Sequence, residues 1–241
     1  MQKTCLVRLE NVSKEYVAGS EVTSVLQETT FEGYEGELTL LLGPSGSGKT
    51  TFLSLLAGFT RPTTGKVILF GNDLRSYSSR KLAELRALRI GFVFQNFLLI
   101  DSLTVEENIE LVRAFARHAQ ARSDHRGTKG INRRSKNDRD QVQQLLERFG
   151  IGSLRHRYPM QLSHGEKQRV AIARAIAGDA RLILADEPTA SLHPAQGLEV
   201  IQLLRQLAID DKRAVIIASH DIRLTSFATR AIEINNGYLT E

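Results

Sequence analysis

One glycine-rich segment of the sequence could bind a phosphate. Residues 43–50 match the pattern G-x-x-x-x-G-K-[ST] with Gly43, Pro44, Ser45, Gly46, Ser47, Gly48, Lys49 and Thr50. They lie between an apolar run at 37–42, which predicts a buried strand, and a helical stretch at 49–57. In that setting, backbone N–H groups, a helix N-terminus and the Lys49 ammonium all face one anion. The segment therefore predicts a P-loop in which Lys49 contacts phosphates and Thr50 binds Mg²⁺, with Thr51 beside them.

A second segment ends an apolar strand in two adjacent acids. Residues 182–185 are all apolar, and Asp186 and Glu187 follow them directly. Burying a strand that ends in two carboxylates is costly unless a cation meets them. A P-loop site needs an acid at this edge of the sheet to hold Mg²⁺, and Asp186 suits that role. We expect Glu187 to point toward the γ-phosphate and to act as general base on the attacking water.

Short apolar runs alternate with helical stretches along most of the chain, which predicts an α/β fold with a mostly parallel sheet. Besides 37–42, the candidate strands lie at 5–10, 22–31, 66–70, 90–94, 181–186, 214–219 and 231–235. The triplet at 235–237, Asn-Asn-Gly, predicts a hairpin turn. Two capping boxes predict helix starts, one formed by Thr104 with Glu107 and one by Ser163 with Glu166.

Composition and charge limit the class of protein. The 241 residues are 41% hydrophobic and 24% charged, with one cysteine, so an internal disulfide is excluded. The chain has no apolar run long enough to cross a membrane and does not open with a secretory signal, which favours a cytosolic protein. Of the net charge of +5, residues 113–139 contribute nine Lys/Arg and two Asp. The basic character is thus local, and a dedicated nucleic-acid binder is disfavoured.

Three further motifs follow in order. They are Leu-Ser-His-Gly-Glu at 162–166, Asp-Glu-Pro-Thr-Ala-Ser-Leu at 186–192 and Ala-Ser-His-Asp at 218–221. With the P-loop and the strand-end acids, they resemble the ATP-binding subunits of ABC transporters over nearly the whole chain. The stretches at 94–99 and 103–109 resemble the lipoprotein-releasing, macrolide-exporting and cell-division branch. The resemblance implies a P-loop NTPase fold in one domain, 1–241, with an antiparallel β subdomain and a helical subdomain at about 96–176.

The resemblance also implies roles for single residues. Tyr16 resembles the aromatic residue that stacks on adenine, and Gln95 resembles the glutamine that reaches Mg²⁺ and the water. His220 resembles the histidine that contacts the γ-phosphate. In the family, the signature closes on the γ-phosphate held by the partner subunit. Its equivalents here are Ser163, which caps a helix whose free N–H groups form an anion site, with Gly165 and Glu166.

The expected activity is ATP hydrolysis that drives membrane subunits in envelope export or in lipid, lipoprotein or peptide handling. The cofactors are ATP and Mg²⁺, and the partners are a second copy or a paralogue and transmembrane permease subunits. The expected location is peripheral, on the cytoplasmic side of the membrane. Two alternatives stay open: an ATP-dependent regulatory or scaffolding subunit of a membrane complex, and a soluble ABC ATPase of DNA repair or translation. A basic nucleic-acid binder is a weaker third.

Two residues and one segment depart from the family pattern. His164 stands where the signature has glycine, and His193 stands where the family has an aspartate that helps couple the two sites. We expect hydrolysis to continue with looser coupling between the sites. The polar, basic stretch at 118–137 predicts an exposed, mobile insertion. Residues 113–139 could contact anionic lipid, although a solvated loop is the simpler interpretation.

Overall fold

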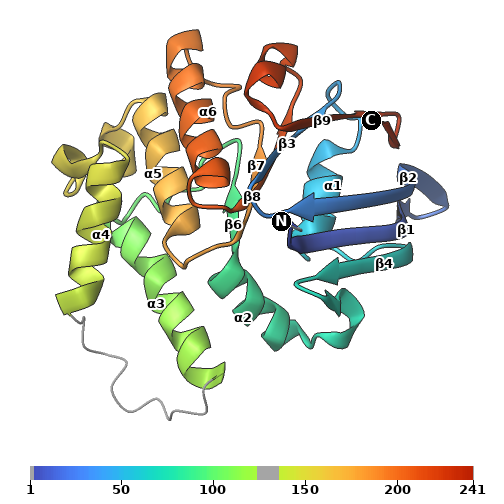
Figure 1. Ribbon diagram of the computed structural model, residues 1–241, viewed down its shortest axis with the longest axis horizontal. Helices are drawn as coiled ribbons and strands as arrows, with labels where there is room; N and C mark the ends of the chain where they lie inside the picture. The colour runs from blue at the N-terminus through green and yellow to red at the C-terminus, as the bar shows by residue number, and fades with distance from the viewer. Residues whose placement is uncertain (1–2, 124–135, 241) are drawn as a thin grey trace.

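Two sheets and a group of helices make up the fold (Figure 1). The computed structural model describes residues 3–123 and 136–240. The helices α3, α4 and α5 lie at one end of the view, the small antiparallel sheet lies at the other, and the strands of the large sheet run between them. This arrangement is the α/β class predicted from the alternation of strands and helices.

The large sheet carries the elements that position the candidate site. Its strand order is β10-β9-β3-β8-β7-β6, and every pairing except β10 with β9 is parallel. The strands are β3 (Glu37–Leu42), β6 (Ile90–Val93), β7 (Leu182–Asp186), β8 (Ala214–Ser219), β9 (Arg230–Asn235) and β10 (Tyr238–Thr240). Because the carboxyl ends of parallel strands meet at one edge, the residues that follow β3, β6, β7 and β8 are brought to the same side.

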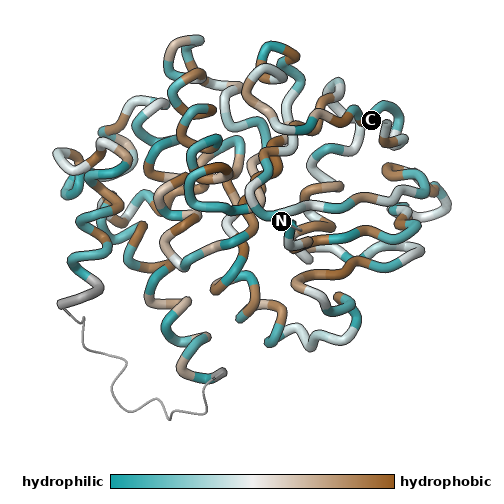
Figure 2. The backbone as a smooth tube through the Cα atoms, viewed as in Figure 1, coloured by the Kyte–Doolittle hydropathy of each residue, from teal (hydrophilic) through white to brown (hydrophobic). Residues whose placement is uncertain are grey.

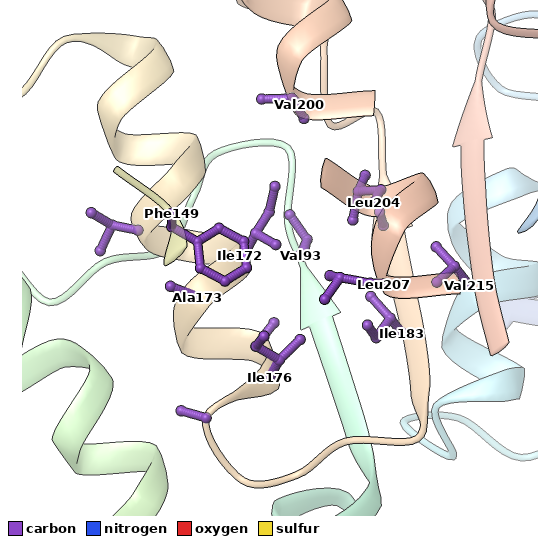
Figure 3. Packing of buried hydrophobic residues seen from close by; sticks show 14 of the residues in the cluster. Val93, Phe149, Ile172, Ala173, Ile176, Ile183, Val200, Leu204, Leu207 and Val215 are labelled. Atoms are coloured by element: carbon purple, nitrogen blue, oxygen red, sulfur yellow. The ribbon is translucent and has the colours of Figure 1, made fainter. Parts of the chain in front are cut away.

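The central strands are buried on both faces, which explains their uninterrupted apolar sequences. On β8, Val215 and Ile217 face one hydrophobic cluster, while Ile216 faces the other. The first cluster is built with α5 (His164–Ile176) and α6 (Pro194–Ile209), as Figure 3 shows for Val93, Ile172 and Leu204 among others. In Figure 2 the same central strands run through the most hydrophobic part of the tube. Two separate cores therefore hold the sheet rigid beneath the site.

The small sheet is antiparallel, with strand order β2-β1-β4-β5. Its strands are β1 (Cys5–Ala18), β2 (Glu21–Tyr34), β4 (Thr64–Leu69) and β5 (Asn72–Asp73). β1 is longer than the predicted run at 5–10, because after several register shifts its second half still pairs with β2, up to Ala18 opposite Glu21. Tyr16, which lies beyond the predicted strand at 5–10, is therefore part of β1, and a strand that ends before Tyr16 is wrong.

Six α-helices and four 3₁₀ turns lie in the described part of the chain. Besides α5 and α6, the helices are α1 (Lys49–Leu56), α2 (Ser79–Arg89), α3 (Val105–Ser123) and α4 (Lys136–Arg148). The turns are η1 (Leu74–Ser76), η2 (Gly152–Leu154), η3 (Pro159–Gln161) and η4 (Ile222–Phe227). Both predicted capping boxes are confirmed, since Thr104 and Ser163 exchange hydrogen bonds with the glutamates three residues later.

The expected insertion at 118–137 is partly helical. Helix α3 continues to Ser123 and α4 begins at Lys136, so the ends of the predicted loop belong to helices, and Ala119 is buried. The reason is local propensity, because Ala, Gln and Arg at 119–122 are good helix formers. The remainder of the predicted insertion, 124–135, lies outside the described residues.

One buried amide fixes the path of the chain between β6 and α3. Asn108 is fully buried, and its Nδ2 donates to the carbonyl oxygens of Ile100, Leu103 and Thr104 at 3.0–3.1 Å. Its Oδ1 accepts from the Ile100 N–H at 2.9 Å. A single side chain thus satisfies four backbone groups of a segment that has no regular hydrogen-bond ladder.

Replacing Asn108 with alanine should lower the free energy of unfolding by about 2–4 kcal/mol, since the Ile100 N–H and the Leu103 carbonyl lose their partner, while the Ile100 and Thr104 carbonyls keep a backbone donor. Asn96→Ala, at an exposed position of the same connection, is the matched control and should cost less than about 0.5 kcal/mol. Urea unfolding of both variants measures the difference. Equal urea midpoints for the two variants would contradict the role of Asn108 in fixing the chain between β6 and α3.

Candidate active site

The glycine-rich segment forms a tight loop between β3 and α1. Gly48, at the N-cap of α1, has φ +106°, and a Cβ there would lie 2.7 Å from the carbonyl oxygen of Val25. A Cβ on Gly43 would lie 2.3 Å from the carbonyl oxygen of Ile234. Only glycine fits at either position, because a side chain would collide with backbone on the neighbouring segments. The loop is therefore pressed against the sheet with its helix N-terminus at the carboxyl edge.

Lys49 connects this loop to the strand-end acids. Its side chain is 6% exposed, and its Nζ donates to the carbonyl oxygens of Gly43 at 2.8 Å and Pro44 at 2.9 Å. The same Nζ lies 3.4 Å from Glu187 Oε1. The ammonium is thus fully surrounded by acceptors, which is the condition under which a lysine can be buried with its charge.

Asp186 and Thr50 meet at the same edge. The Thr50 hydroxyl donates to Asp186 Oδ2 at 2.7 Å. Asp186 is 8% exposed, and burial raises the pKa of its carboxyl above the usual value, while the hydrogen bond from Thr50 opposes that shift. Its other oxygen, Oδ1, is buried with no hydrogen-bond partner among the described residues, and the same is true of Ser47 Oγ in the loop. A cation beside Oδ1 would offset the cost of burying the Asp186 carboxylate and would give Oδ1 the partner that it lacks.

These oxygens are a suitable donor set for Mg²⁺. Hydroxyl and carboxylate oxygens are the ligands that this ion prefers, and it binds through few protein groups while keeping water and phosphate oxygens. Thr50 and Asp186 therefore fit an ion that also binds the phosphates.

Glu187 lies between two nitrogen groups. Its Oε1 faces Lys49, and its Oε2 is 3.0 Å from His220 Nδ1, so the imidazole donates when the carboxylate is ionised. The backbone of Glu187 has φ +47°, which costs a non-glycine residue about 1–3 kcal/mol. The Glu187 N–H donates to the Ala218 carbonyl at 2.9 Å, which helps to hold that conformation. The side chain is only 12% exposed, whereas His220 is 59% exposed.

Gln95 and Tyr16 lie at the margins of this cluster. Gln95 is exposed in the turn that follows β6, at the carboxyl edge of the sheet. Tyr16 is 45% exposed on β1, and Lys14 Nζ lies 4.7 Å from the centre of its ring. An exposed ring with a cation on one face is able to stack on a planar ligand with the other.

The signature segment forms the N-terminus of α5. Ser163 is the N-cap, and its hydroxyl accepts from the Glu166 N–H at 3.3 Å. Glu166 Oε2 in turn accepts from the Ser163 N–H and hydroxyl, and these bonds hold the pKa of the Glu166 carboxyl below its usual value. Gly165 is buried, and a Cβ there would lie 3.0 Å from the Gln196 side chain.

The structure brings together one group of the predicted residues and separates the other. Lys49, Thr50, Asp186, Glu187 and His220 form one contact network. Helix α5, whose first turn follows Ser163, lies well apart from α1 in Figure 1, with central strands between them. Within one chain, the helix that begins at the P-loop and the helix that begins at the signature therefore lie apart.

The order of these motifs on this fold is shared with known proteins. A sequence profile of the ABC transporter family matches residues 26–190. The chain belongs to this family. An uncharacterized ABC transporter ATP-binding protein of Thermotoga maritima is 38% identical over 232 residues, which are 96% of this chain and 92% of that protein. The ABC fold and the ATPase activity predicted from the motifs agree with this membership.

Two further relatives of this ABC protein are informative. The macrolide export ATP-binding/permease protein MacB of Escherichia coli K12 is 37% identical over 97% of the chain, which spans only 34% of MacB. A dimeric ATP-binding cassette solved in a post-hydrolysis state with ADP and Pi has a TM-score of 0.82 at 34% identity. That match covers 96% of this chain and 95% of the solved chain.

Sequence patterns missed one residue that contacts the segment after Gln95. Arg174 on α5 donates to the carbonyl oxygens of Phe97 and Leu98, just after Gln95. His193, one of the two departures, is the exposed N-cap of α6 and makes no capping hydrogen bond. The looser coupling expected from His193 stays a prediction. The arginine gave no local signal, because its partners lie far away in the sequence.

Replacing Asp186 with asparagine should stabilise the nucleotide-free protein at neutral pH. Because burial raises the carboxyl pKa of the folded state, the wild type loses stability as the pH rises from the unfolded pKa through the folded one. The variant lacks that loss, so its melting temperature should be about 2–4 °C higher at pH 7–8. Asp179→Asn, at an almost fully exposed carboxylate, is the control.

Thermal unfolding followed by circular dichroism between pH 4 and pH 8 measures this difference. The advantage of Asp186→Asn should shrink toward pH 4, because the wild-type carboxyl takes up its proton as the pH falls through the raised folded-state pKa. A constant difference across that range, or a lower melting temperature for Asp186→Asn at pH 8, would contradict the assigned cause.

Proposed function

We propose that two copies of this ABC protein, or one copy and a close paralogue, bind two ATP molecules between them and hydrolyse the ATP to drive membrane subunits. The observation that carries the proposal is the division of the predicted residues into two separate sites. The P-loop, Asp186 and Glu187 form one of them, and the signature at the start of α5 forms the other. A second chain would bring its signature to the open side of the first chain's P-loop.

The chemistry follows from the contacts of the P-loop site. Lys49 would exchange its loop carbonyls for β- and γ-phosphate oxygens, and Ser47 Oγ would gain a phosphate partner. Thr50 and Asp186 would hold Mg²⁺, which neutralises charge on the phosphates. Glu187, released from Lys49, would accept a proton from the attacking water, and His220 would orient Glu187 through Nδ1.

The other predicted residues complete this site. The capped N-terminus of α5, with Ser163, Gly165 and Glu166, would contact the γ-phosphate held by the partner chain. Gln95 would reach the ion and the water from its turn after β6, and the Tyr16 ring would stack on adenine. The dimeric cassette with ADP and Pi supports this arrangement, since its chain matches nearly all of this one. The helical subdomain at about 96–176 would carry the signature toward the partner.

We propose that ATP hydrolysis by this protein drives membrane subunits. No helix in the described ranges 3–123 and 136–240 is long and apolar enough to cross a bilayer. The relative MacB is named for both an ATP-binding and a permease part, and this chain matches about a third of its length. We infer a peripheral position on the cytoplasmic side and a role in export or in the handling of lipid, lipoprotein or peptide.

A basic cavity supports the proposed contact with anionic lipid. A cavity of about 1060 Å³ between α2, α3 and α4 is lined by seven Lys and Arg and by two acidic side chains. Arg113 and Arg117 of the basic stretch at 113–139 line it together with Arg148 and Arg213. Burial lowers the pKa of the Arg213 guanidinium, and the nearby carboxylates of Asp211 and Asp179 oppose that shift.

Substitutions at the P-loop site should separate binding from hydrolysis. Lys49→Ala should abolish detectable ATP binding, because the buried ammonium is the one full positive charge in the loop. Glu187→Gln should bind ATP, hydrolyse it at least about 100-fold more slowly and accumulate dimers. ATP binding, phosphate release and sedimentation velocity measure the three quantities. Full turnover by Glu187→Gln would remove Glu187 from its role as base.

Binding to anionic vesicles should depend on the basic stretch. Neutralising Arg126, Lys129, Arg133 and Arg134 with glutamine should reduce co-sedimentation with phosphatidylglycerol vesicles by at least tenfold, since each cation near the surface adds about 1 kcal/mol. The control neutralises four exposed cations elsewhere, Lys66, Arg75, Arg80 and Lys212, and changes the net charge equally. Equal binding by the two variants would end the proposal of a specific lipid contact.

A further inference from the structure

The signature helix touches the segment that follows Gln95 through His164, which stands where the family signature has glycine. The ring of His164, the first residue of α5, stacks on the ring of Phe97 with centroids 5.9 Å apart and planes 27° apart. Glycine at this signature position has no ring and could not make the contact. His164 therefore adds a link between two functional segments that are more than sixty residues apart in the sequence.

A second contact joins the same two segments farther along the helix. Arg174, ten residues after His164, donates from Nη2 to the Phe97 carbonyl at 2.7 Å and from Nη1 to the Leu98 carbonyl. Phe97 and Leu98 both have left-handed backbone conformations, with φ +58° and +46°. Two adjacent non-glycine residues hold such conformations only where the surroundings fix them. The segment after Gln95 is therefore clamped on α5.

The His164 and Arg174 contacts together constrain the segment after Gln95 more than Arg174 alone would. Ten residues of α-helix span about 15 Å, so Arg174 alone is an anchor far from the capped N-terminus of α5. Helix α5 is held by its buried residues in the first hydrophobic cluster, so with that single anchor the Gln95 turn could still shift relative to Ser163. The stack at His164 adds a contact between that turn and the N-terminal end of the helix, one residue from Ser163. Movement at the Gln95 turn must then be carried to the signature.

We propose that His164 is a positioning residue, which couples the Gln95 turn to the signature by stacking on Phe97 and so places Ser163 against the ATP of the partner chain. This rests on the proposed function, in which the signature of one chain completes the site of the other. His164 itself contacts Phe97 and acts through Ser163. The ring, rather than the charge, performs this role.

Substitutions at 164 and 97 in the Glu187→Gln background test the role. His164→Ala removes the ring and retains a good helix former, so it should raise the ATP concentration needed for half-dimerisation by about three- to tenfold. His164→Phe should restore the parent value, and His164→Lys should not. Phe97→Ala should raise that ATP concentration as much as His164→Ala does. The double variant should raise it no further than either single variant. Phe115→Ala and His156→Gly, at exposed positions, are controls.

The affinity of the monomer for ATP should stay within about twofold of the parent in all these variants, because the P-loop is not altered. A general loss of structure would weaken both ATP binding by the monomer and dimerisation. Rescue by lysine but not by phenylalanine would show that charge near the phosphate matters, and would overturn the proposal. Additive effects in the double variant, or parent-like dimerisation of His164→Ala, would also overturn it.

Hydrogen exchange in the nucleotide-free protein tests the contact without relying on dimers. The amides of Phe97 and Leu98 should exchange about three- to tenfold faster in His164→Ala than in the parent, and His164→Phe should restore the slower rate. Unchanged exchange in His164→Ala would exclude the stack. If Glu187→Gln failed to dimerise with ATP, the proposed dimeric function would fail, while the exchange rates would still decide whether His164 fixes this segment.

Discussion

Lys49 carries a buried ammonium at the carboxyl edge of the central sheet, and the other groups of the site are arranged around it. Two loop carbonyls and Glu187 surround its charge, and Glu187 in turn meets His220. A buried cation with this many partners is satisfied but remains able to exchange acceptors. A phosphate that replaced Glu187 as the partner of Lys49 would free the Glu187 carboxylate to accept a proton from water. In the proposed mechanism, ATP binding would therefore also activate Glu187 as the base.

The fold supplies the rigidity that such an exchange needs. Alternate residues of β3, β7 and β8 face two separate hydrophobic cores, so the strand ends that carry Asp186 and Ser219 cannot shift independently. Eight non-glycine residues in the described ranges have left-handed backbone. Three of them, Glu187, Phe97 and Leu98, lie at the site or just after Gln95, where specific contacts hold them.

Contiguous motifs and strand polarity allowed much of this to be predicted from the sequence. The P-loop, the Asp186–Glu187 pair and His220 each follow a recognisable apolar strand, and parallel strands necessarily bring them together. Contacts between distant segments could not be predicted in this way. Arg174 and Phe97 are separated by 77 positions, and the Gly43 constraint depends on Ile234. The length of β1 was missed because register shifts hide its pairing from any local pattern.

The central claim is that one complete site is built from two chains. Mixing two inactive variants tests it most directly: Lys49→Ala, which keeps its signature, and Ser163→Arg, which keeps its P-loop. The account predicts that each is inactive alone and that the mixture hydrolyses ATP, because a mixed dimer contains one intact site. A mixture that stays inactive, although both variants are folded and Ser163→Arg binds ATP, would contradict it.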